Sequence, residues 1–161
     1  WNVSASLLDD KGGRSNYRET FVLMSDASID HGKILSWAGL LPGNINILRN
    51  LSLNNTGNDI IAQINLTGKN LTQYPSGTGL ISASNFSAND NSISTCASGI
   101  RMNHGVTKEI LGVSLAVGNN SAGFGQDSLF VCFLQVPIGL PASEYRAGVT
   151  NSWEITTVPP T

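Results

Sequence analysis

The side chains best suited to catalysis are the two histidines, His31 and His104, because an imidazole can serve as the general base for a serine nucleophile. Asp30 precedes His31, which places a carboxylate beside one imidazole in the sequence. Both histidines lie in polar, turn-like segments, and with 19 serines in the chain a serine near a histidine is expected in any fold. We therefore predict that the chain is not an enzyme.

Metal and phosphate sites have equally little support. The spacings HxH, HExxH and CxxC are absent, and the glycines form no phosphate-binding motif. Residues 9–16, DDKGGRSN, have the oxygen ligands and glycines of a calcium loop but lack its alternating acids and its closing glutamate, so a surface turn is the simpler interpretation. We expect no metal and no cofactor.

Asn-x-Ser/Thr triplets, the acceptors for N-linked glycans, are the strongest chemical signal. The composition predicts about three such triplets by chance. The seven acceptors present are Asn2, Asn50, Asn54, Asn65, Asn70, Asn85 and Asn119. We expect N-linked glycans on several of them, with the five acceptors from Asn50 to Asn85 as the best candidates.

The three tryptophans allow two interpretations. Trp1, Trp37 and Trp153 could form a platform on which sugar rings stack, or they could belong to the core or to an interface, as tryptophans at strand ends more often do. The sequence alone leaves both open.

Size and charge restrict the class of protein. A chain of 161 residues fits one domain, and a net charge of −2 with scattered Lys and Arg makes nucleic acid an unexpected partner. No apolar run is long enough to span a membrane, and a start at Trp1 fits removal of a leader. Cys96 and Cys132 could be a disulfide or two unrelated thiols, and the glycan acceptors favour the disulfide. Together these features predict an extracellular, cell-surface protein.

Alternation of apolar and polar residues predicts an all-β fold. We expect a single β-sandwich of jelly-roll or immunoglobulin-like type with about 8–10 strands. A hairpin is predicted from two alternating arms, 48–54 and 59–67, and a short helix near 142–145. The other predicted strands cover residues 1–8, 19–24, 34–37, 79–86, 110–117, 128–136 and 151–158.

Residues 40–66, LLPGNINILRNLSLNNTGNDIIAQINL, run from a Pro-Gly turn through a strand and an Asn-rich turn into a second strand. This order resembles the TasA/camelysin family of secreted biofilm-fibre proteins and the related archaeal bundling pili. The resemblance implies jelly-roll β-sandwich subunits that polymerise by donor-strand complementation, each lending an N-terminal strand to the next. The glycan acceptors and the cysteine pair favour an archaeal, glycosylated version.

Residues 1–10 are then expected to be the donor strand and 11–161 the sandwich. One face of the first strand carries Trp1, Val3, Ala5 and Leu7, the residues we assign to polymerisation. The polar residues 9–16 would serve as its linker. An ordinary first strand, paired within its own domain, has the same alternation. Two functions therefore stay open: a subunit of an extracellular homopolymer, or a monomeric cell-surface or S-layer module for adhesion or carbohydrate binding.

Overall fold

The computed structural model describes residues 2–8, 14–20, 26–31, 35–90, 96–118, 123–148 and 152–158, and within 2–20 it describes the backbone alone. The described residues form thirteen strands and two short 3₁₀ helices, η1 (Ala83–Asn85) and η2 (Cys96–Ser98), and contain no α-helix. The predicted all-β class is therefore confirmed. We call residues 26–158 the body.

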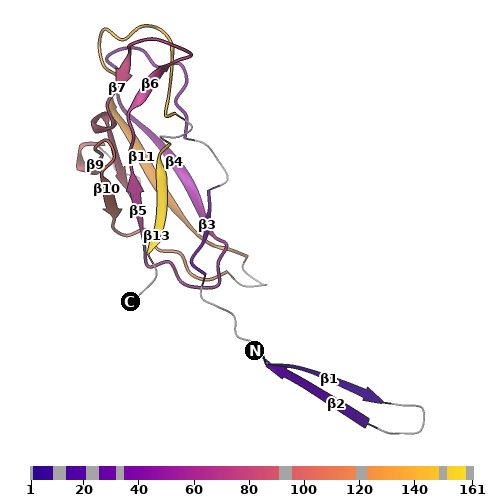
Figure 1. Cartoon of the computed structure of the whole chain (residues 1–161). Coiled ribbons are helices and arrows are strands. Elements are labelled where there is room, and N and C mark those ends of the chain that lie inside the picture. The colour runs from indigo at the N-terminus through magenta and orange to yellow at the C-terminus, as the bar shows by residue number, and fades with distance from the viewer. Residues whose placement is uncertain are drawn as a thin grey trace.

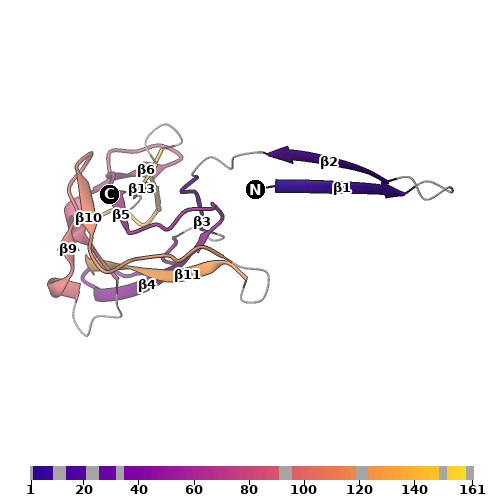
Figure 2. The ribbon, with the colours of Figure 1, turned by 90° about the horizontal axis from the view of Figure 1, so that it is seen from below.

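The N-terminal strands form a hairpin. β1 (Asn2–Leu8) and β2 (Arg14–Thr20) are antiparallel, with Asn2 opposite Thr20 and Leu8 opposite Arg14. They pair only with each other and not with any described strand of the body. Figures 1 and 2 show the hairpin clear of the body sheets. The first strand lies where the sequence predicted it, whereas the second begins at Arg14 and so takes up part of the expected linker.

The largest sheet of the body has the strand order β3-β4-β11-β8-β9. The two long strands, β4 and β11, are antiparallel from Asn55 opposite Gly125 to Ile45 opposite Gln135. The bounds are β3 (Ile29–Asp30), β4 (Ile45–Asn55), β8 (Phe86–Asn89), β9 (Ile100–Arg101) and β11 (Gly125–Gln135).

Two three-stranded antiparallel sheets complete the body, with the orders β10-β5-β13 and β12-β6-β7. None of the sheets formed by the described strands closes into a barrel. The bounds of these strands are β5 (Gln63–Thr67), β6 (Leu71–Tyr74), β7 (Leu80–Ile81), β10 (Thr107–Ile110), β12 (Glu144–Arg146) and β13 (Glu154–Val158).

The sheets share one apolar core because each long strand buries every second residue on the same side. β11 buries Leu129, Val131 and Phe133, as expected of a strand in the middle of a packed protein. Phe86 lies at the centre of an aromatic cluster. Its ring centroid is 4.4 Å from that of Phe133, 5.4 Å from Trp37 and 5.4 Å from Trp153. The described tryptophans therefore belong to the core.

The predicted hairpin of residues 48–67 is wrong. Its first arm is β4, which pairs with β3 and β11, and its second arm, β5, pairs with β10 and β13 in another sheet. Both arms bury apolar faces, Leu51 and Leu53 on β4 and Ile64 and Leu66 on β5. Two such apolar faces are both buried when the strands lie in different sheets on opposite sides of the core. Residues 55–62 therefore connect one sheet to the other.

Four shorter predictions also differ from the structure. Of the predicted strand 110–117, only Ile110 lies in a strand, β10, and Leu115 forms an isolated bridge with Ile61. Residues 142–145 form no helix and lead into strand β12. The predicted strand 79–86 is divided into β7, η1 and the start of β8. Residues 35–37 form no strand, and residue 34 lies outside the described residues.

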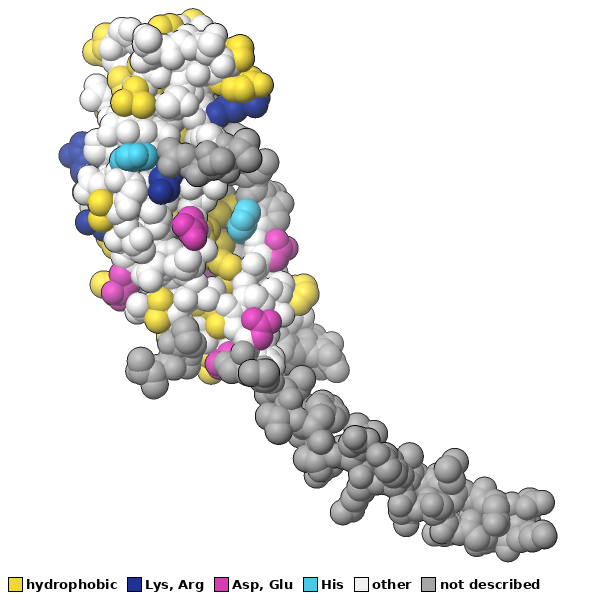
Figure 3. All heavy atoms as spheres, viewed as in Figure 1, with side chains coloured by type: hydrophobic (Ala, Val, Ile, Leu, Met, Phe, Trp, Pro, Cys, Tyr) yellow, Lys and Arg dark blue, Asp and Glu magenta, His cyan; other side chains and the backbone are white. Residues whose placement is uncertain are grey.

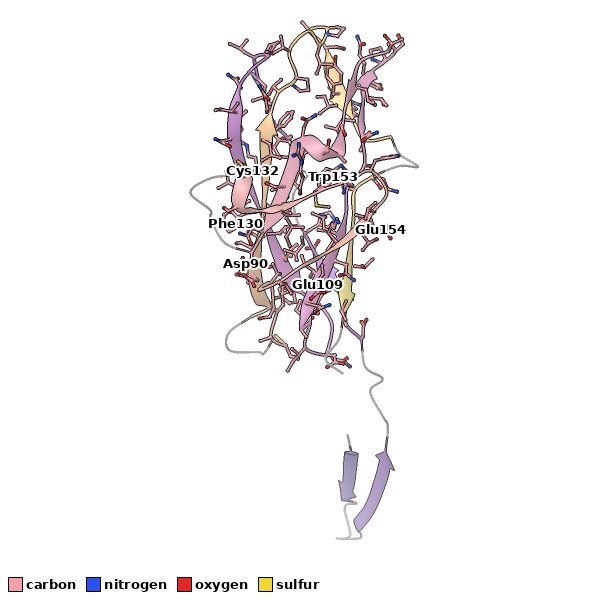
Figure 4. The ribbon with its side chains drawn as sticks, turned by 90° about the vertical axis from the view of Figure 1, so that its left-hand side faces the viewer. Asp90, Glu109, Phe130, Cys132, Trp153 and Glu154 are labelled. Atoms are coloured by element: carbon pink, nitrogen blue, oxygen red, sulfur yellow. A yellow bond between two sulfur atoms is a disulfide. The ribbon has the colours of Figure 1, made fainter. Side chains whose placement is uncertain are left out.

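The expected disulfide is present between Cys96 and Cys132, whose Cα atoms are 5.5 Å apart. Cys132 lies on β11, on the same face of the sheet as Phe130 (Figure 4). The bridge holds η2 against this face, and the Ser87 hydroxyl donates to the Cys96 carbonyl at 2.6 Å. Closing a loop of 36 residues in the unfolded chain stabilises the native state by about 4 kcal/mol in the loop-entropy model.

The loop at residues 55–59 is organised by one buried amide. Asn55 is 1% exposed, and its Nδ2 lies 2.7 Å from the Asp59 carbonyl, 3.1 Å from that of Ala116 and 3.4 Å from that of Leu115. Its Oδ1 accepts from the Gly57 N–H at 2.9 Å. The amide thus joins the end of β4 to the segment that bridges to Ile61, just before β5.

Asn55→Ala should lower the free energy of unfolding by about 2–3 kcal/mol, because the carbonyls of Asp59 and Ala116 and the N–H of Gly57 lose their hydrogen bonds to this side chain. Urea denaturation measures this. Ser52→Ala, an exposed change on the same strand, should stay within about 0.5 kcal/mol of the parent chain. Equal stability of the two variants would contradict the role of the amide.

Candidate functional site

The feature of the body best suited to binding another strand is the outer edge of β4. On one side β4 pairs with β11 over its whole length. On the other side β3 pairs with Asn54 and Asn55 alone, and no other described strand reaches residues 45–53. The described strands thus leave most of this edge unpaired, while residues 32–34, which follow β3, lie outside the described residues. An unpaired edge presents a row of backbone donors and acceptors to an incoming chain.

The hydrogen bond at the end of this edge shows which residues of β4 direct their N–H and C=O groups outward. The Thr56 N–H donates to the Ser28 carbonyl at 3.0 Å, and backbone direction alternates along a strand. Leu48, Asn50 and Ser52 therefore turn their N–H and C=O groups toward the same side. The Leu48 carbonyl accepts from Arg49 Nη1 at 3.1 Å, which is one way in which a charged side chain covers a strand edge.

Residues 35–40 cover the core beside this edge with side chains. Leu35, Trp37 and Leu40 are partly buried and pack against the core. Trp37 Nε1 donates to the Ile47 carbonyl at 3.2 Å. Because Asp30 pairs with Asn54 and Trp37 bonds to Ile47, the segment and β4 run antiparallel, but the described ladder ends at Asp30.

The start of the body is anchored firmly at the far end of this edge. The Asp26 carbonyl accepts from the N–H of Asn58 at 2.9 Å and from that of Asp59 at 3.2 Å. Asn58 Oδ1 in return accepts from the Asp26 N–H at 2.7 Å. The Thr157 hydroxyl donates to the Ala27 carbonyl at 2.7 Å, so β13 also holds the segment. The chain that leads out to the hairpin therefore leaves from a fixed point.

The residues assigned to polymerisation receive only partial description. Val3, Ala5 and Leu7 lie in β1, where the backbone alone is described, and Trp1 lies outside the described residues. Trp37 and Trp153 face the core, and Trp153 Nε1 donates to the Lys69 carbonyl at 2.8 Å. These two rings are thus not arranged as an open platform for sugars.

The glycan acceptors differ in their surroundings. Asn50 is exposed, and so is Ser52, the hydroxyl residue of its triplet. Asn65 and Asn85 are half-buried, and their triplet residues Thr67 and Ser87 are buried.

Two further acceptors use their side chains within the fold. Asn54 Oδ1 accepts from Gln126 Nε2 at 2.9 Å, and Asn70 Oδ1 accepts from the Ala83 N–H at 2.9 Å. Asn119 lies outside the described residues, and Asn2 lies in β1.

The predicted absence of catalytic machinery stays a prediction. His104 Nδ1 accepts from the Asn70 N–H at 3.1 Å, and no hydrogen bond among the described residues joins a serine hydroxyl to either histidine. No group of three or more His, Cys, Asp or Glu side chains in the described part of the chain is arranged to hold a metal ion. Of the suspected calcium loop, residues 9–13 lie outside the described residues. No helix of the described ranges is long and apolar enough to cross a membrane.

One ion pair stands out on β12. Arg146 Nη2 donates to Glu144 Oε2 at 2.9 Å, and the guanidinium carbon lies 3.8 Å from the centre of the Tyr74 ring. The hydrogen bond from Arg146 lowers the pKa of Glu144, and the same bond raises the pKa of Arg146. Both groups are exposed, so solvent screens the pair and it contributes little to stability.

The edge of β4 that the described strands leave unpaired was not predicted, because residues 54–58 were predicted to be the turn of a hairpin. In a hairpin, β5 would have occupied this edge. The missed signal is Asn55, whose position in the alternation matches the buried Leu51 and Leu53.

Comparison of the chain with protein-family models, with curated proteins and with solved structures found no match.

Asn70→Ala should lower the free energy of unfolding by about 1–2 kcal/mol, because the Ala83 N–H loses its acceptor. Asn50→Ala should change it by no more than about 0.5 kcal/mol. Both are measured by urea denaturation of chain made without glycans, so that only the side chain differs. If the two variants unfold at the same urea concentration, the structural role of Asn70 is refuted.

Proposed function

We propose that the protein is the repeating subunit of an extracellular filament, a pilus or biofilm fibre, that polymerises by donor-strand complementation. The donor is the N-terminal strand, and the acceptor is the open edge of β4 in the next copy. The body would then be a β-sandwich of the jelly-roll type, as in the TasA/camelysin proteins and the archaeal bundling pili that the sequence resembles. N-linked glycans would coat the strands that stay exposed.

The observation that carries this proposal is the incomplete edge of β4. β4 is as long as β11, yet among the described residues its outer side is paired only at Asn54 and Asn55. A strand placed there would form main-chain hydrogen bonds with Leu48, Asn50 and Ser52, as in β-strand addition. Each such bond contributes about 1 kcal/mol.

The hairpin supplies a second argument. A two-stranded hairpin alone is marginally stable in water and needs a further strand or a surface to pack on. β1 has seven residues, which extend about 23 Å. The stretch of β4 from Ile45 to Leu53 extends about 30 Å, so it is long enough to pair with the whole of β1.

The pairing of β1 with β2 also suits the alternative, a monomeric cell-surface or S-layer module. In a monomer, the hairpin would pack on its own body and complete it. Both functions require a docked hairpin, and they differ in whether it docks on its own chain or on another.

The donor strand is tested by Val3→Asp with Leu7→Asp, which places two charges on its apolar face. We expect filaments of the parent chain in electron micrographs and folded, unpolymerised subunits of the variant, because burying a carboxylate in the acceptor is costly. Ser4→Asp with Ser6→Asp is the control, with equal charge on the opposite face. Because Ser4 completes the Asn2 glycan acceptor, all three chains are made without glycans. Polymerisation of both variants alike, or a parent chain that stays monomeric in sedimentation, would exclude strand donation.

The acceptor edge is tested by Ser52→Pro, which removes one outward N–H without breaking the ladder to β11. Assembly should weaken by about tenfold, a loss of about 1.4 kcal/mol, while the subunit stays folded by circular dichroism. Ser52→Ala is the matched control, because it removes the Asn50 glycan acceptor equally but keeps the N–H. Assembly of the proline variant at the level of the alanine variant would show that β4 is not the acceptor.

A further inference from the structure

We propose that successive copies also meet end to end, with an apolar tip at one end of the body packed on an apolar surface at the opposite end of the next copy. This inference rests on the proposed polymer, and the two surfaces would determine the direction in which that polymer grows. The observations behind it are the two apolar ends, the distribution of charge between them and the point from which the hairpin leaves.

The first end, which we call the proline end, is built from turns next to Pro42 and Pro137. The Asn44 N–H donates to the Leu41 carbonyl at 3.0 Å, and Gly43 has φ 85°, a conformation that glycine adopts without strain. Gly139 has the same φ in the second turn. The Gly43 N–H donates to the Val136 carbonyl at 2.9 Å, which holds the two turns together.

These turns expose large apolar side chains. Ile138 is 80% exposed and Leu41 is 67% exposed. Tyr74 joins this end because the Ser143 hydroxyl donates to its carbonyl at 3.0 Å. The exposed apolar residues of the proline end are Leu41, Ile45, Tyr74, Leu80 and Ile138.

The opposite end, which we call the aspartate end, has a second apolar group. Leu111 is 65% exposed and Phe124 is 58% exposed. The bridge between Ile61 and Leu115 brings their loops together. The exposed apolar residues of this end are Ile60, Leu111, Val117 and Phe124. β11 connects the two ends, and its 11 residues extend about 37 Å.

Charge is distributed unequally between the ends. The described aspartates all belong to the half at the aspartate end: Asp26, Asp30, Asp59, Asp90 and Asp127. The described basic residues of the body lie between its middle and the proline end: Arg49, Lys69, Arg101, Lys108 and Arg146. Glu109 lies next to Lys108 on β10 and Glu144 is paired with Arg146 on β12, so this half is less basic than the other half is acidic. Figure 3 shows this separation on one face, with Lys and Arg above and most of the Asp and Glu below.

This polarity selects the partner and its orientation. Two aspartate ends in contact would bring their carboxylates together, which is unfavourable. An anionic membrane is a poor partner for either end, because the aspartate end is acidic and Arg146 at the proline end is paired with Glu144. A proline end on an aspartate end buries both apolar groups without bringing two acidic ends together.

The end-to-end contact and strand donation both place the next copy at the aspartate end of the first. Asp26, the first described residue after the hairpin, is bound to the loop that precedes Ile60, so the hairpin leaves from the aspartate end. The next copy would present its proline end there, where β4 begins at Ile45. A head-to-tail contact between opposite ends of a long body builds an open filament when the rotation between copies does not close a ring.

The test uses the full chain with Val3→Asp and Leu7→Asp, in which strand donation is blocked. Sedimentation velocity over a concentration series should still detect weak, reversible self-association of this chain. Adding Ile138→Asp or Phe124→Asp should weaken it by about tenfold to a hundredfold, because each change removes an apolar contact from one end. Val106→Asp, at an exposed apolar residue in the turn between β9 and β10, is the matched control and should have no effect.

Mixing the Ile138→Asp and Phe124→Asp chains should give a one-to-one dimer that grows no further, because each chain keeps one intact end. The proposal is overturned if the strand-blocked chain never associates, if Val106→Asp weakens association equally, or if the mixture stays monomeric. Failure of strand donation gives a different result: the parent and strand-blocked chains then associate alike, while the dependence on both ends persists.

Discussion

The buried amide of Asn55 is the constraint on which the arrangement of the body depends. The chain must leave the five-stranded sheet after β4 and enter the β10-β5-β13 sheet, and the loop that makes this crossing is fixed by the four contacts of that side chain. The outer surface of the same loop binds residues 26–28. One polar group in the interior therefore determines how two sheets meet and where the N-terminal segment leaves the body.

Much of the secondary structure could be predicted from alternation. β11 was instead found as a run that is largely apolar on both faces, which is typical of a strand in the middle of a packed protein. The disulfide to Cys132 was expected from the cysteine pair together with the glycan acceptors. The pairing of strands could not be predicted. Residues 48–67 have the pattern of a hairpin, but two adjacent strands can equally face each other across a core. Only the buried position of Asn55 distinguishes these arrangements.

The candidate edge depends on the same distinction. In a hairpin, β5 would have paired with the outer side of β4, and no acceptor would remain. Once β5 belongs to another sheet, the described partner of that side is the short β3, and the side chains of Leu35 and Trp37 cover the core without extending the ladder. Such a local pattern predicts that a strand exists, whereas a free edge is a property of the whole topology.

Several glycan acceptors lie away from the apolar ends, which is consistent with both proposals. Asn50 and Asn65 lie on strands and Asn85 ends η1, all between the two ends, and none belongs to either apolar group. Glycans on the sides of a subunit would oppose lateral pairing of strands while leaving end contacts free. A chain with few charges has little electrostatic repulsion to prevent lateral association. Bulky neutral groups on its sides would restrict growth to the long axis, and this gives a physical reason for so many acceptors in one short stretch of sequence.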